Sequence, residues 1–188
     1  MRKLLGVLVL VAGVLGGCGS QAAPPAAPAA PVSAFNPTDV AWLQLMIPMD
    51  EQLLRVLGLA GDRSVDPAVR RIVAELTVSH RAELVQLVAL RDRVGAPTAN
   101  VHEGHDMPGM MTENEVVALG GLRGAAFDRV LRAEVTDHLA QSLVVTRGCV
   151  SAGREPAVKQ LATGIEKTRT LQTAQLSRWR PGTPRTAG

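Results

Sequence analysis

The sequence predicts an all-α four-helix bundle built from two repeated αα-hairpins. Four long stretches of the chain carry apolar residues at helical spacing and contain few proline or glycine residues. The second pair of stretches repeats the first pair at a constant offset. No stretch has the alternating pattern of a half-buried strand. Together these observations favour a fold of helices packed on helices.

The first two helices are predicted over residues 36–59 and 66–95. Asn36 and Asp66 stand at their starts, and each is followed directly by proline. An Asn or Asp side chain at this position accepts hydrogen bonds from the free N–H groups of the first turn. Proline suits the next position because its missing N–H would have no helical partner. The two starts are therefore well defined.

The second half of the chain is expected to begin with a short extra helix. Thr112 and Glu115 have the spacing of a capping box, and three glycines soon afterwards disturb the helix that they open. The third long helix is predicted over residues 125–149. The fourth is predicted over residues 155–179 and again has proline directly after its first residue.

The two halves correspond at a fixed distance along the chain. Pro67 and Pro156 lie 89 positions apart, and this offset keeps register over both helices of each pair. The same offset pairs Asp39 with Asp128, Val69 with Val158, Arg70 with Lys159, Leu76 with Ile165, and Leu87 with Leu176. A duplicated αα-hairpin predicts a four-helix bundle, with the connection between the halves as its crossover.

The start of the chain is predicted to be a lipoprotein signal peptide, residues 1–18. It has a basic beginning, an apolar run too short to span a bilayer with ease, and the ending Leu-Gly-Gly-Cys at 15–18. This ending resembles the bacterial lipobox, in which the cysteine, here Cys18, is lipidated. The chain would then be anchored to the extracytoplasmic face of the cell membrane. An ordinary cleaved signal and an uncleaved anchor are the alternatives.

The remaining segments follow from composition. Residues 19–34 are rich in Ala and Pro and are expected to form a tether. Residues 35–180 are the predicted bundle domain, and residues 181–188 are expected to be a disordered tail. With Cys18 lipidated, Cys149 has no partner in the chain for a disulfide.

Charge and motifs exclude several functions. The formal net charge of +3 is spread over the chain and aromatic residues make up 2%, so no nucleic-acid interface is expected. The chain contains neither a Gly-x-Ser-x-Gly nucleophile motif nor a glycine-rich phosphate loop after a strand. We therefore expect a protein without enzymatic activity.

Polar residues interrupt the apolar stripe of each long helix near its midpoint. In an antiparallel bundle these midpoints lie at one level, so the polar side chains are expected to converge. They are Asp50, His80, Glu83, Glu134, His138 and Gln172. Buried carboxylates and imidazoles are costly unless they pair or bind an ion. A metal site, a hydrogen-bonded acid–imidazole network, and partial exposure of these residues to water are the three interpretations.

The connection between the halves is rich in metal-binding side chains. It carries His102, His105, Met107, Met110 and Met111. Imidazole and thioether groups together suit a soft or borderline ion such as Cu(I), Cu(II) or Zn(II). The alternative is a flexible connector whose methionines pack on the bundle.

Two segments resemble a known family. Residues 102–112, His-Glu-Gly-His-Asp-Met-Pro-Gly-Met-Met-Thr, are similar to the inter-repeat loop of the bacterial secreted domain-of-unknown-function family 305. Residues 39–48 resemble that family's motif in the first helix. The resemblance implies a ferritin-like four-helix fold, and some members of the family are linked to copper handling.

The resemblance also implies differences at the family's characteristic positions. Each odd-numbered helix of the family usually carries two adjacent histidines, and the second helix carries Gln and Glu three apart. The corresponding residues here are Met49 and Asp50, His138 and Leu139, His80 and Glu83, and Arg169 and Gln172. A methionine in place of histidine favours Cu(I).

The sequence thus predicts an envelope lipoprotein that binds a transition metal for buffering or resistance, and the resemblance implies that the metal is copper. Its expected ligands are the five loop residues above together with Met49, Asp50, His80, Glu83, Glu134 and His138. The alternative is a metal-free envelope interaction module that keeps the fold. A di-iron redox enzyme ranks lower, because the fourth helix offers Arg169 and Gln172 where such a centre needs carboxylates.

Overall fold

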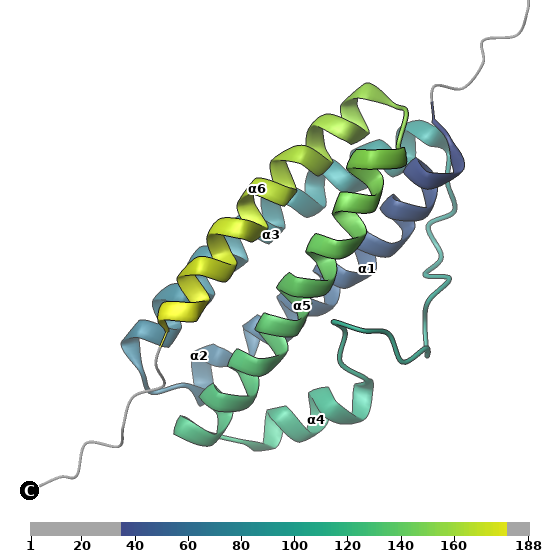
Figure 1. The fold of residues 1–188 in the computed structure, drawn as a ribbon. Helices are drawn as coiled ribbons and strands as arrows, with labels where there is room; N and C mark the ends of the chain where they lie inside the picture. Colours follow the sequence, from purple (N-terminus) through teal and green to yellow (C-terminus); the bar gives the residue numbers. More distant parts are fainter. Residues whose placement is uncertain (1–34, 180–188) are drawn as a thin grey trace, which may run out of the picture. The chain divides into compact units, whose positions relative to one another are not determined.

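Four long helices make up most of the part of the chain that the computed structural model describes, residues 35–179 (Figure 1). They are α1 (Pro37–Gly58), α3 (Pro67–Val94), α5 (Gly124–Ala152) and α6 (Pro156–Arg178), with the short α2 (Ala60–Arg63) and α4 (Glu113–Gly121) between them. These residues contain no strand. The all-α four-helix prediction is confirmed. The predicted signal peptide, tether and tail, with Cys18, lie outside the described residues.

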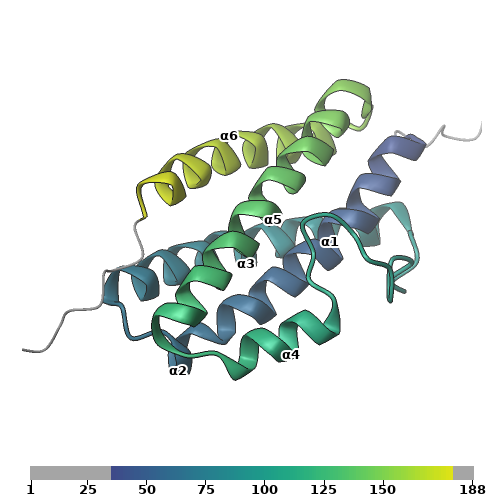
Figure 2. The ribbon, with the colours of Figure 1, turned by 60° about the horizontal axis from the view of Figure 1, so that its bottom comes forward.

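The long helices pack as two hairpins. α1 packs against α3, α5 packs against α6, and α1 and α5 join the pairs (Figure 1). The short α4 lies beside the ends of α1 and α5 (Figure 2), where Arg63 Nε donates a hydrogen bond of 2.6 Å to the carbonyl of Gly120. None of the described helices is long and apolar enough to cross a bilayer.

Capping residues set the helix boundaries as the sequence predicts. Asn36 Oδ1 accepts a hydrogen bond of 2.9 Å from the Asp39 amide, and Asp39 Oδ2 accepts one of 2.8 Å from the Asn36 amide. Asp66 accepts from the amide of Ala68 at the start of α3. Gly95 ends this helix in the left-handed region, with φ of 68°, where glycine has no steric penalty. The starts of α1 and α3 are therefore satisfied locally.

Asp39 also connects the two hairpins. Its buried carboxylate accepts hydrogen bonds of 3.1 Å from the backbone amides of Arg154 and Glu155, which lie just before α6. Gly153 makes this approach feasible, because a Cβ there would lie 2.6 Å from Asp39 Oδ1. The first turn of α1 thus holds the turn between α5 and α6.

Two apolar clusters fill the bundle, one on each side of a polar layer. One cluster includes Leu53, Leu76 and Phe127, and the other includes Met46 and Leu87. Along the long helices, Asp50, His80, Glu83, Ser142, Arg169 and Gln172 lie between the segments that contribute to the two clusters. The polar layer is therefore enclosed by apolar packing from both ends.

The buried stripe of α5 departs from the prediction that Glu134 lies at the common polar level of the interior. Glu134 and Gln141 are only half-buried, whereas Val135 and Ser142 are buried. The buried stripe of α5 runs Phe127, Leu131, Val135, His138, Ser142, Thr146 and Cys149. This spacing of fours and threes averages more than 3.5 residues, so the stripe moves around the helix relative to a heptad pattern. On α6, Arg169 is buried, whereas Thr168 directly before it is half-buried.

Replacing Phe127 should test the packing of the first cluster. This side chain is fully buried, and Phe127→Ala should lower the free energy of unfolding by about 3–5 kcal/mol, because it removes apolar contacts and leaves a cavity. Urea unfolding followed by circular dichroism measures the change. Val144 on the same helix is 61% exposed, so Val144→Ala should change stability by less than about 0.5 kcal/mol. Equal losses in the two variants would contradict this packing.

Candidate metal centre

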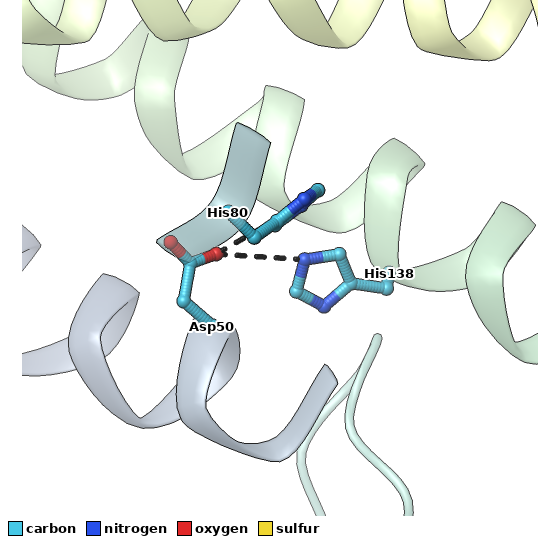
Figure 3. Close-up of side chains that lie close together, drawn as sticks. All are labelled: Asp50, His80 and His138. Atoms are coloured by element: carbon cyan, nitrogen blue, oxygen red, sulfur yellow. Dashed lines mark ion pairs between the residues drawn. The ribbon is translucent and has the colours of Figure 1, made fainter. Parts of the chain in front are cut away.

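Three side chains from three helices converge in the polar layer (Figure 3). Asp50 comes from α1, His80 from α3 and His138 from α5. Asp50 Oδ1 lies 4.0 Å from His80 Nε2 and 3.9 Å from His138 Nε2. One potential ligand atom from each of the three residues lies within 4.8 Å of the others, and all three residues are buried. The sequence predicted this convergence of residues that are far apart in the chain.

The two imidazole nitrogens that face Asp50 Oδ1, and the other oxygen of Asp50, have no hydrogen-bond partner among residues 35–179. They are Nε2 of His80, Nε2 of His138 and Oδ2 of Asp50. A buried polar atom without a partner costs about 1–3 kcal/mol. A cation that accepts electron pairs from two imidazoles and a carboxylate would satisfy all three groups. This donor set suits a transition metal.

Backbone hydrogen bonds orient both imidazoles. His80 Nδ1 lies 2.9 Å from the carbonyl of Leu76. Because a carbonyl can only accept, Nδ1 carries the proton, and the lone pair of Nε2 faces Asp50. The His138 ring makes its own hydrogen bond to the backbone of Gly109. Metal-binding histidines in proteins are usually held in this way through the second ring nitrogen.

Arg169 of α6 occupies the other side of the polar layer and is fully buried. Its Nη2 donates to Glu83 Oε1 at 2.6 Å and to Asp50 Oδ1 at 3.3 Å. Nε donates to Ser142 Oγ at 2.9 Å, and Nη1 donates to Gln172 Oε1 at 3.2 Å. The guanidinium thus reaches all four long helices. We call Asp50, His80, Glu83, His138 and Arg169 the buried polar site.

Sequence reasoning did not place Arg169 in the interior, although a signal was present. The repeat offset of 89 pairs Arg169 with His80, and it pairs Gln172 with Glu83. Both members of each pair are buried. The repeat was therefore a better guide to the buried stripe of α6 than its apolar pattern.

Burial and neighbouring charges shift the protonation of the site. Burial, followed by the Glu83 carboxylate, raises the pKa of Asp50 well above its usual value, and Arg169 opposes this. Burial also raises the pKa of Glu83 against the effect of Arg169. Burial and then Arg169 lower the pKa of His80 to about 3. Burial, His80 and Arg169 hold the pKa of His138 well below its usual value. Both imidazoles are therefore neutral at neutral pH, which is the form that binds metals.

Two other predicted interior ligands, Met49 and Glu134, are not part of the cluster of Asp50, His80 and His138. Met49 is buried next to Asp50 on α1, within the second apolar cluster. Glu134 is half-buried, and the charges of Glu115 and Asp137 raise its pKa after the effect of burial. Glu134 is not among the residues whose ligand atoms converge, so the structure does not bring it into the buried polar site.

The loop histidines and methionines lie apart from this site. His102 is half-buried and His105 is exposed, and both line a pocket of about 740 Å³ together with Met110 and Met111. Met107 is half-buried and does not line this pocket. Within residues 35–179, the loop histidines belong to no group of three or more His, Cys, Asp or Glu side chains with metal-binding spacing.

The loop is nevertheless anchored on the bundle. The Met111 amide donates a hydrogen bond of 2.8 Å to Gln52 Oε1, and Gln52 Nε2 donates to the Met111 carbonyl. Gly109 lies against α5 with φ of 76°, and a Cβ there would lie 2.6 Å from Gln141 Cβ. This close approach lets the backbone of Gly109 reach His138. The loop therefore supports the buried site even though its own histidines lie elsewhere.

A groove between α3 and α6 reaches the edge of the buried polar site. It has a volume of about 660 Å³ and is lined by small side chains, including Ala82 and Ala157 and the bare backbone of Gly164. Glu83 is the acidic residue in its lining and is 5% exposed. The groove therefore brings solvent close to the Glu83–Arg169 pair.

These features define an all-α protein of two hairpins around a buried carboxylate–imidazole site. The family model described as Domain of unknown function (DUF305) matches residues 39–180. The chain belongs to this family, and the resemblance seen in its sequence is confirmed. No curated protein matches the chain.

Solved structures show the same fold. A DUF305 protein of Streptomyces coelicolor, described as secreted, aligns with a TM-score of 0.67 and 22% identity, covering 74% of this chain and 89% of that one. A DUF305 fragment from Deinococcus radiodurans aligns with a TM-score of 0.68 and 23% identity, covering 76% and 95%. CopM in its Cu(I)-bound form aligns with a TM-score of 0.62 and 13% identity, covering 75% and 94%. CopM in its Cu(II)-bound form gives 0.64 and 16% over the same shares.

The depressed pKa of His80 should appear in the pH dependence of stability. The folded pKa of about 3 is below the unfolded value of about 6.5, so folding keeps His80 neutral. Its contribution is complete above about pH 6.5 and decreases as the pH falls through 6.5 toward 3. Without metal, wild type should lose about 2 kcal/mol more than His80→Gln between pH 7 and pH 5. Urea unfolding with a chelator present measures this, and equal losses would contradict a neutral buried His80.

Proposed function

We propose that this protein binds a transition-metal ion, copper, at Asp50, His80 and His138, and that it acts without catalysis in copper buffering or resistance at the cell envelope. The observation that carries the proposal is a set of buried donor atoms that face one another: two imidazole nitrogens without a hydrogen-bond partner and the carboxylate oxygen Oδ1 of Asp50. The copper-bound forms of CopM, which has a similar fold, support the choice of metal.

The chemistry of the site supports the same conclusion. Neutral imidazoles and a carboxylate are ready ligands for copper, because the imidazoles need not lose a proton to bind. The ring orientations are set in advance by the Leu76 carbonyl and the Gly109 backbone. Binding would replace three unsatisfied polar groups with coordinate bonds, so the ion should stabilise the folded state.

Thermal unfolding tests the metal site. A specific ion should raise the melting temperature of the wild type by several degrees, because it binds the native state and not the unfolded chain. We expect this rise with Cu(I) under reducing conditions. The double substitution His80→Gln and His138→Gln should remove the rise while retaining the helical circular dichroism spectrum.

A matched loop variant separates the two predicted sets of ligands. His102→Ala with His105→Ala changes two histidines that lie outside the buried site. This variant should keep at least most of the metal-induced rise. If it loses the rise and the buried-site variant keeps it, the metal is bound by the loop and the assignment of the buried site is wrong.

We further propose that the protein is a lipoprotein on the extracytoplasmic face of the membrane. The Leu-Gly-Gly-Cys sequence at 15–18 supports this, as does the description of the Streptomyces coelicolor relative as secreted. Cys18→Ser removes the acceptor of the lipid. The wild type should fractionate with membranes and be extracted by detergent, whereas Cys18→Ser should lose its lipid-dependent mobility on gels. Incorporation of labelled fatty acid into wild type alone would support the proposal, and incorporation into neither would exclude it.

A second candidate is a metal-free envelope interaction module. The Arg169 guanidinium favours it, because this side chain already pairs with both Asp50 and Glu83 and so neutralises part of the buried charge without an ion. Such a site would serve to fix the register of the helices. In that case, no ion would change the melting temperature of the wild type.

A further inference from the structure

The buried polar site contains an unequal set of charges. Asp50 and Glu83 contribute two carboxylates and Arg169 contributes one guanidinium, all with 5% exposure or less. The imidazoles of His80 and His138 are neutral when they act as ligands. Ser142 and Gln172 complete the contacts of Arg169 and carry no charge. With both carboxylates ionised, the site has a net charge of −1.

We propose that Arg169 makes this site selective for a monovalent soft ion, Cu(I) or Ag(I), over divalent ions such as Zn(II). The inference rests on the proposed function, since it concerns which ion the Asp50–His80–His138 cluster accepts. It adds Arg169 of α6, which would not contact the ion itself. Arg169 would act through the carboxylate of Asp50, to which both the guanidinium and the ion would bind.

The charge balance carries the argument. A monovalent ion brings the site to neutrality, whereas a divalent ion leaves one positive charge without a partner in the interior. Burying an uncompensated charge is costly, because the apolar clusters on both sides offer nothing to solvate it. An arginine side chain stays protonated in proteins, so its charge is a permanent part of the site.

The guanidinium of Arg169 lies close to the place where the ion would bind. Asp50 Oδ1 lies 3.3 Å from Arg169 Nη2, and the same oxygen faces Nε2 of both histidines. An ion held by Asp50 and the histidines would therefore share one carboxylate with the guanidinium. The repulsion between two cations at a fixed separation is proportional to the charge of the ion, so a divalent ion is penalised twice as much.

Arg169 cannot move away to relieve this repulsion. Its nitrogen atoms donate to Ser142, Gln172, Glu83 and Asp50, and the side chain has no exposure to solvent. The repeat offset places it at the position that corresponds to His80 in the first half. The second half of the bundle thus supplies a fixed cation where the first half supplies a ligand.

A series of charge variants tests the proposal with Ag(I) and Zn(II), which do not change oxidation state during the measurement. Competition titrations of the purified protein in chloride-free buffer give the affinity for each ion. Arg169→Gln makes the site −2, and the ratio of Zn(II) to Ag(I) affinity should rise at least about tenfold, which is about 1.4 kcal/mol. Arg169→Lys retains the charge and should keep the wild-type ratio within about threefold.

Two further variants keep the test decisive if Arg169→Gln does not fold because Glu83 loses its partner. Combining Arg169→Gln with Glu83→Gln restores a net charge of −1, and the ratio should return to the wild-type value. Glu83→Gln alone makes the site neutral, and the ratio should fall at least about tenfold below wild type. Circular dichroism confirms that each variant is folded.

The outcomes separate this inference from the proposed function. If the wild type binds ions at the histidines but the ratio is the same in all folded variants, charge selection by Arg169 is wrong and the metal site stands. If the wild type binds neither ion, the proposed function is wrong and this inference fails with it. A ratio that follows the net charge across the series supports the proposal.

Discussion

The contact of Arg169 with Glu83 and Asp50 is the interaction on which the rest of the interior depends. Two carboxylates in an apolar bundle would each cost several kcal/mol without a partner. One guanidinium between them offsets part of this cost, and it does so only when α1, α3 and α6 are in one register. Ser142 adds α5 to the same set of contacts. The ion pair therefore fixes the level at which all four long helices meet.

The duplication explains why one half of the site differs from the other. The repeat offset places His80 opposite Arg169 and Asp50 opposite Leu139, while the helices themselves keep the same hairpin arrangement. A symmetric pair of hairpins would present two equal sets of ligands. This chain instead has two imidazoles on one side of the Asp50 carboxylate and the permanent cation of Arg169 on the other. Divergence of the side chains has left one candidate metal site on a duplicated backbone arrangement.

The sequence predicts the local features of this fold well. Asn36 and Asp66 act within a few residues, so their caps can be read directly. Asp50, His80 and His138 could be placed at one level because each interrupts an apolar stripe at mid-helix. The apolar pattern did not place Arg169 there, because an arginine in a helix normally extends to solvent and only partners on other helices make its burial stable; the repeat offset alone pointed to it. The contact of Gly109 with Gln141 could not be predicted from the sequence, since it depends on how a long loop folds back onto α5.

The connection between loop and site follows from that contact. The backbone of Gly109 is hydrogen-bonded to the His138 ring. Two residues farther along the loop, the Met111 amide donates a hydrogen bond to Gln52. Gln52 lies on α1 two residues after Asp50, so the loop is also hydrogen-bonded to the helix that carries Asp50. A metal-binding residue is most effective when its orientation is set before the ion arrives. The loop over residues 102–112, although rich in histidine and methionine, thus supports the site chiefly through its backbone.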